Sequence, residues 1–140
     1  MPLSTPDIWD DACKHLSKRD RVMKKLISRL GEGRLESRGD AFTTLARSIV
    51  GQQISVKAAQ AVWDRFVALT AGPSHRLLPA TVLDLEAAHI RAAGLSARKV
   101  EYLCDLAQHF ESGAVHPAQW REMDDEAIID ELVAIRGIGR

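Results

Sequence analysis

Cysteine is scarce in this sequence, and the scarcity excludes several kinds of site. The 140 residues contain two cysteines, Cys13 and Cys104, which lie far apart and share no paired spacing. Zinc sites and four-cysteine iron–sulfur clusters need more thiolates at closer spacing, so neither can be built within this chain. We expect two reduced thiols, as in a cytosolic protein.

Long apolar runs and an excess of either charge are also missing. No apolar run approaches the length that spans a bilayer. The first residues, MPLSTPDIWDDACKHL, lack the basic segment and apolar stretch of a signal peptide. We therefore expect no membrane partner. The net charge is zero, which argues weakly against phosphate binding, because phosphate-binding proteins usually carry a basic excess.

The charge is distributed less evenly than its sum suggests. Residues 14–38 contain nine basic and three acidic side chains, whereas residues 118–131 contain six acidic side chains and one basic. Both runs fit solvated helix faces. The basic run fits equally well a flank that lies near a polyanion.

Helical spacing of apolar residues runs through nearly the whole chain, of which 46% is hydrophobic, and no stretch alternates with period two. It predicts helices near 8–16, 22–30, 40–50, 55–67, 86–93, 96–113 and 124–135, and a short helical turn capped by Thr81. Plausible caps are Asp40, Ser55, Ser96, Asp124 or Asp125, with Gly31 as a C-terminal stop. The predicted fold is all-α, with seven or eight helices in one domain over 1–140.

The last ten residues, ELVAIRGIGR, are typical of the first half of a helix-hairpin-helix. Leu132 and Ile135 stand upstream at helical spacing, and Gly137 and Gly139 follow. Glycines allow positive φ and leave no Cβ between the backbone and a ligand. Outward amides of such a turn bind an anion such as a DNA phosphate, and carbonyls on its other side can hold a monovalent cation. Taken alone, the motif also fits a plain tight turn.

A second unusual stretch is SIVGQQISVKAA, residues 48–59. Gln52 and Gln53 stand at the tip between two predicted helices. A glutamine there can satisfy local backbone groups. Alternatively, its planar amide can probe a gap in a duplex and bond to base edges.

Three stretches in this order resemble the helix-hairpin-helix DNA glycosylases, and within them the 3-methyladenine DNA glycosylase II branch. They are FTTLARSIVGQQISVKAAQAVWDRF, IRAAGLSARKVEYLCDLA and IDELVAIRGIGR. The resemblance covers roughly residues 42–140, so residues 41–140 carry the motifs. Residues 1–40 are plausible as the leading helices of that family but contain no motif.

The resemblance implies an enzyme of base excision repair. Such enzymes flip a damaged nucleotide out of double-stranded DNA and hydrolyse its N-glycosidic bond, here for alkylated bases such as 3-methyladenine. The resemblance implies a place of action in the nucleoid of a bacterial cytoplasm or in a nucleus. We expect a monomer, although nothing in the residues themselves indicates the oligomeric state. No cofactor is expected, apart from a structural monovalent cation at the hairpin.

The resemblance also assigns residues to DNA binding. Gln53 matches the position that plugs the gap left by the flipped base, and Gln52 would brace that loop. Ser55 falls where some relatives place a larger side chain in the minor groove, so that contact is uncertain here. The remaining predicted DNA contacts are Ser96 near the minor groove, Arg98 and Lys99 toward the backbone, and Gly137, Gly139 and Arg140 toward a phosphate. The predicted cation ligands are the main-chain carbonyls of Val133, Ile135 and Ile138.

The catalytic carboxylate of the family has no match here. It is an aspartate on the loop after the second helix of the hairpin, and residues 1–140 stop before that position. Asp84, Asp105 and Asp130 lie in other contexts. We therefore expect the N-terminal part of a longer enzyme, with Trp120, Ile128, Leu132 and Ile135 left partly exposed.

Two alternatives stay open. In a glycosylase with lyase activity, a lysine nucleophile directly follows the Gly-x-Gly-x of the hairpin, which would be position 141. An aromatic residue there would favour the alkylbase enzyme instead. The second alternative is a non-catalytic helix-hairpin-helix module that binds DNA.

Overall fold

The structure is a computed structural model that describes residues 8–34, 39–70 and 77–140. It divides into two compact units, residues 1–39 and 40–140, and each is described by itself. The single domain expected from the sequence stays a prediction. Glu36 and Arg38, two residues of the basic run, lie outside the described residues. Most of residues 71–79, for which the sequence predicts a linker, lie outside them as well.

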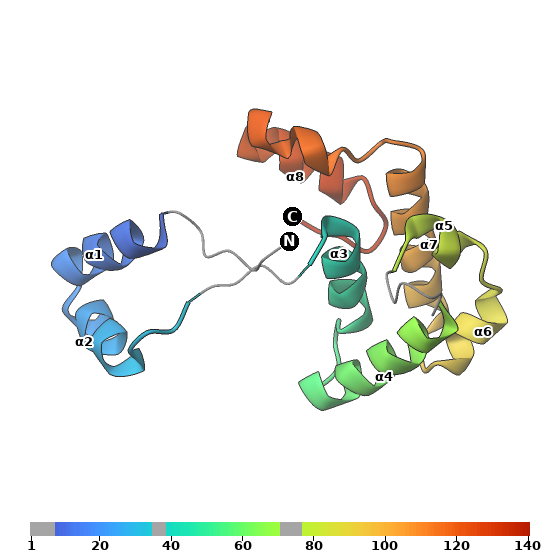
Figure 1. Ribbon diagram of the computed structural model, residues 1–140, viewed down its shortest axis with the longest axis horizontal. Helices are drawn as coiled ribbons and strands as arrows, with labels where there is room; N and C mark the ends of the chain where they lie inside the picture. Colours follow the sequence, from blue (N-terminus) through green and yellow to red (C-terminus); the bar gives the residue numbers. More distant parts are fainter. Residues whose placement is uncertain (1–7, 35–38, 71–76) are drawn as a thin grey trace. The chain divides into compact units, whose positions relative to one another are not determined.

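The described chain is helical throughout, which confirms the all-α class (Figure 1). Its helices are α1 (Trp9–Arg19), α2 (Arg21–Leu30), α3 (Ala41–Val50), α4 (Val56–Leu69), α5 (Pro79–Leu83), α6 (Ala87–Ala92), α7 (Ala97–Glu111), the 3-10 helix η1 (Pro117–Glu122) and α8 (Asp125–Val133). None of them has the length and apolar character needed to cross a bilayer.

Local signals set most helix starts as predicted. Asp40, Ser55, Ser96 and Asp124 each accept a hydrogen bond from the backbone N–H three residues later. Thr81 does not cap α5, which is a correction. That helix begins at Pro79, because the fixed φ of proline suits the first helical position and its missing N–H is not needed there.

The first unit is a helical hairpin in which α1 and α2 lie side by side (Figure 1). Asp20 separates them and caps α2 by accepting from Val22 N and Met23 N at 2.8 and 3.0 Å. Gly31 ends α2 with φ of 64°. Within the described part of this unit no residue is buried, so α1 and α2 do not by themselves form an apolar core.

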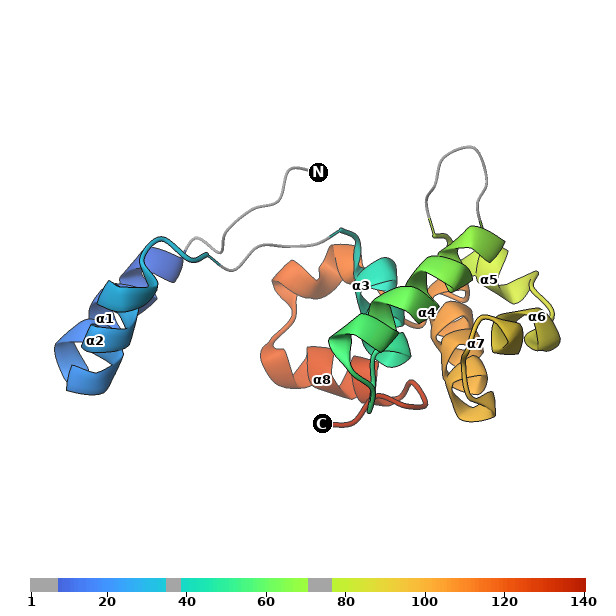
Figure 2. The ribbon, with the colours of Figure 1, turned by 90° about the horizontal axis from the view of Figure 1, so that it is seen from below.

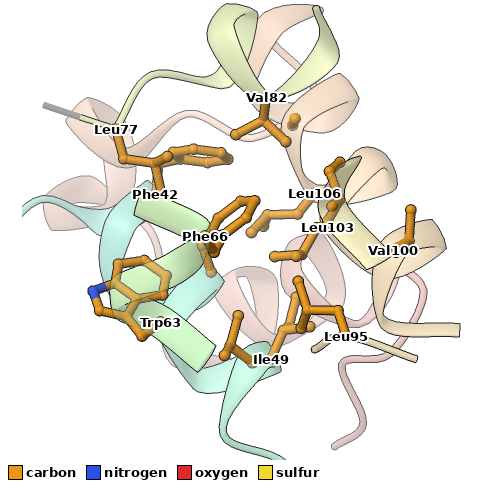
Figure 3. Packing of buried hydrophobic residues seen from close by; sticks show 14 of the residues in the cluster. Phe42, Ile49, Trp63, Phe66, Leu77, Val82, Leu95, Val100, Leu103 and Leu106 are labelled. Atoms are coloured by element: carbon orange, nitrogen blue, oxygen red, sulfur yellow. The ribbon is translucent and has the colours of Figure 1, made fainter. Parts of the chain in front are cut away.

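The second unit has a continuous apolar core built mainly by α3, α4 and α7, with one buried residue each from α5 and α6. Figure 3 shows Phe66 of α4 pointing toward Leu103 and Leu106 of α7. Ile135 is 1% exposed, which corrects the expectation that it would be left partly in water. It packs into the same cluster, whereas Leu132 and Trp120 lie half-buried at its edge.

Candidate nucleic-acid interface

The α3–α4 loop is a short, strained connection. Gly51 ends α3, and Ser55 Oγ begins α4 by accepting from Ala58 N at 3.2 Å. Between them Gln53 has φ of 62°, the only positive value of a non-glycine residue in the described chain. Such a conformation costs about 1–3 kcal/mol and persists where the surroundings enforce it. Gln53 is exposed, so the strain presents this residue to solvent.

Lys99 fixes that loop from the first turn of α7. Its ammonium donates hydrogen bonds to Val50 O at 2.9 Å and to Gln52 O at 2.7 Å. Burial lowers the pKa of Lys99. Two of its three N–H donors are therefore directed at protein backbone, while the adjacent Arg98 is exposed. The predicted phosphate contacts of Lys99 and Arg98 stay predictions.

Gln52 connects the loop to the end of the chain. Its Nε2 donates to Gly137 O at 2.9 Å, across 85 positions of sequence. Figure 2 shows the resulting arrangement, with the red terminal segment beside the α3–α4 loop. The two unusual motifs of the sequence therefore lie on one surface.

The turn after α8 is held by α7. Gly137 has φ of 90°, and a Cβ built on it would lie 2.5 Å from the Tyr102 ring, so only glycine fits. Arg136 N donates to Asp105 Oδ2 at 2.8 Å. The Arg136 guanidinium also lies 3.3 Å from Glu101.

Two amides of this turn have no hydrogen-bond acceptor in the described part of the protein. Among the described residues, Gly137 N and Gly139 N donate to no acceptor. A Cβ at Gly139 would meet open space, so the backbone there is accessible. Arg140 bonds both carboxylate oxygens of Glu126 at 2.8 and 2.6 Å. This pair is exposed and contributes little, so a phosphate can compete for the guanidinium.

The carbonyls predicted to hold a monovalent cation occupy the C-terminal end of α8 and the turn. Carbonyls at such an end point away from the helix and carry the negative end of its dipole. Ile135 O accepts one hydrogen bond, from Ile138 N at 3.2 Å, and keeps a second lone pair. The cation site formed by this carbonyl with those of Val133 and Ile138 stays a prediction. In the described ranges, no group of three or more His, Cys, Asp and Glu side chains could hold a metal ion.

The acidic run has structural partners. Glu131 accepts from Trp120 Nε1 and from His116 N, which ties η1 to α8. Asp124 caps α8, and Asp125 lies in its first turn, where negative charge is favourable. This run is therefore explained largely by the fold.

Sequence reasoning missed the side chains of α7 that support the turn, namely Glu101, Tyr102 and Asp105. Their spacing places them near one face of the helix. Asp105 is separated from its partner Arg136 by 31 positions, so no local signal identifies the pair. The chain contains one tyrosine, but its contact with Gly137 is visible only in three dimensions.

Residues 46–140 match the family of HhH-GPD superfamily base excision DNA repair proteins. The chain is 31% identical over 130 residues to DNA-3-methyladenine glycosylase 1 of Schizosaccharomyces pombe, covering 90% of this chain and 57% of that protein. It thus spans little more than half the length of this curated relative.

Two solved structures share the fold. The DNA-3-methyladenine glycosidase of Bacillus halodurans is 31% identical with a TM-score of 0.79, covering 99% of this chain and 62% of that one. The 3-methyladenine DNA glycosylase of Schizosaccharomyces pombe in complex with abasic DNA is 29% identical with a TM-score of 0.78, covering 93% and 65%. The family match takes in the α3–α4 loop and the turn at Gly137, and the chain belongs to the HhH-GPD superfamily of base excision DNA repair proteins.

Proposed function

We propose that the protein is a DNA glycosylase of base excision repair that removes alkylated bases such as 3-methyladenine, and that it belongs to the 3-methyladenine DNA glycosylase II branch. The hydrogen bond from Gln52 to Gly137 O carries the proposal. It joins an exposed glutamine loop and a turn with open amides on one surface. Relatives named for 3-methyladenine support the choice of substrate.

In this proposal each motif has a separate task on double-stranded DNA. The amides of Gly137 and Gly139 hold one phosphate, which fixes the register of the duplex. Gln53 fills the space left by the flipped nucleotide and bonds to the orphaned base. Flipping a nucleotide out of the duplex costs a few kcal/mol for unstacking and unpairing, and it costs less at a damaged site. A monovalent cation at the carbonyls of the turn would add positive charge beside the phosphate.

The chemistry needs little acid catalysis, because an alkylated, positively charged base is already a good leaving group. A carboxylate would stabilise the oxocarbenium-like transition state, and residues 1–140 contain no match to it. The activity test therefore uses the natural full-length protein. Such an enzyme would act in the nucleoid or the nucleus.

The test is release of 3-methyladenine from methylated duplex DNA, followed with and without alkali. We expect free base without alkali and strand breaks only after alkali. Strand breaks without alkali would favour the lyase alternative. Absence of base release, with retained DNA binding, would leave the non-catalytic module as the correct reading.

A further inference from the structure

The first turn of α7 has a feature that the phosphate-binding role of Lys99 does not explain. A lysine that serves a phosphate extends into solvent, yet Lys99 donates to two backbone carbonyls of the α3–α4 loop. Both acceptors precede Gln53, Val50 by three residues and Gln52 by one. One is the last carbonyl of α3, at the negative end of that helix.

The second acceptor determines the shape of the loop. Gln52 O belongs to the peptide unit that precedes the Cα of Gln53, so the orientation of this carbonyl determines φ of Gln53. Lys99 Nζ holds it at 2.7 Å. The strained φ of 62° needs such a constraint to persist.

The same helix holds the other DNA-facing segment. Asp105 and Tyr102 of α7 hold the turn at Gly137. Residues 99 and 105 are about 9 Å apart along the helix axis. One rigid element therefore sets the distance between the glutamine loop and the phosphate-binding turn, and the bond from Gln52 to Gly137 O closes the connection.

We propose that Lys99 is a positioning residue, which holds Gln53 in its left-handed conformation at a fixed place beside the Gly137 turn, and acts on DNA through Gln53 rather than through a phosphate. This inference rests on the proposed function. If so, Lys99 determines how strongly the protein prefers gapped or damaged DNA over undamaged DNA. Arg98 beside it attracts the DNA backbone irrespective of sequence.

The experiment compares Lys99→Met and Arg98→Met in the natural full-length protein. Both variants lose one positive charge and keep much of the side-chain stem. Dissociation constants are measured at several salt concentrations, for a duplex with a tetrahydrofuran abasic-site analogue and for the same duplex undamaged. For Lys99→Met we expect a roughly tenfold loss of preference for the abasic duplex, as for one lost charge-assisted hydrogen bond, with an unchanged salt slope. For Arg98→Met we expect a slope lower by about 1 with an unchanged preference.

A second arm tests whether Lys99 acts through Gln53. In a Gln53→Ala background, the Lys99→Met change should cause no further loss of preference, because the group it positions is gone. Equal losses in both backgrounds would overturn the proposal. So would a reduced salt slope for Lys99→Met with its preference unchanged, because that is the behaviour of a phosphate contact.

Val82→Ala serves as the stability control. Val82 is buried in α5, and its truncation lowers stability without touching the loop. If Val82→Ala reduces the preference as Lys99→Met does, the effect is one of stability and the proposal fails. If Lys99→Met itself does not fold, Lys99→Gln takes its place, since it also removes the ammonium that donates to the two carbonyls and should give the same loss. Wild-type protein that shows neither base release nor preference for the abasic duplex refutes the proposed function instead, which separates the two failures.

Discussion

The two compact units of the chain follow the same local rules and differ in what their apolar faces contact. Asp20 caps α2 just as Ser55 caps α4, and both helices carry apolar residues at helical spacing. Yet α2 buries none of its residues, whereas α4 buries Val62, Trp63 and Phe66. Periodicity and caps therefore decide where a helix forms. Its contribution to stability depends on the elements that pack against it.

The largest effect that separates the units is expected from truncating an apolar side chain in each. Phe66 is fully buried, whereas Leu30 is 76% exposed. Phe66→Ala should lower the free energy of unfolding by about 3–5 kcal/mol, and Leu30→Ala should change it by less than about 0.5 kcal/mol. Urea unfolding of residues 1–140, monitored by circular dichroism, measures both.

A large loss for Leu30→Ala would break this comparison, because it would mean that the apolar face of α2 is covered in solution. Repeating the measurement over a range of protein concentrations would then show whether a second copy covers it. A midpoint that rises with concentration indicates association.

An intermediate effect is expected at two glycines with positive φ, Gly31 at 64° and Gly137 at 90°. A Cβ at Gly31 meets no atom within 4 Å, whereas one at Gly137 would strike the Tyr102 ring. At Gly31, where ψ is −130°, the change to alanine should lower the free energy of unfolding by about 1–3 kcal/mol from backbone strain alone. Gly137→Ala should lower the free energy of unfolding by about 1–3 kcal/mol more than Gly31→Ala does, because the Tyr102 ring or the turn must move.

Thermal unfolding combined with binding to abasic DNA measures this difference. Gly139→Ala is the control in the same turn, since a Cβ there meets open space, and its stability should be close to wild type. Equal losses for Gly31→Ala and Gly137→Ala would show that Tyr102 yields without cost and does not support the turn.

The helices and most of their boundaries could be predicted from sequence because they depend on neighbours a few residues away. Caps such as Asp40 and Ser96 are of this kind. The error at Thr81 has the same origin, because the proline two residues earlier is the stronger local signal.

Burial and the assembly of the site could be predicted only in part. The two motifs were each visible, and their contact was not, because it spans 85 positions. Ile135 was expected partly in water and lies in the core instead. The roles of Tyr102 and Asp105 depend on which turn meets α7, which no pattern within α7 reveals.

The smallest expected difference between the two units is in the reactivity of their cysteines, of which each unit contains one. Cys104 of α7 packs against the core, and burial raises the pKa of its thiol. Cys13 lies half-buried in the α1–α2 hairpin.

The thiolate is the reactive form, and a raised pKa reduces its fraction at a given pH. In single-thiol variants made by Cys13→Ala and Cys104→Ala, we therefore expect Cys104 to react several-fold more slowly with a disulfide reagent at pH 8. Because the pKa of Cys104 is raised, its rate should keep rising with pH above the ordinary thiol pKa of about 8.5. Equal rates would mean that α7 opens as readily as the hairpin, and the contrast between a unit with an apolar core and one without would not hold on the timescale of the reaction.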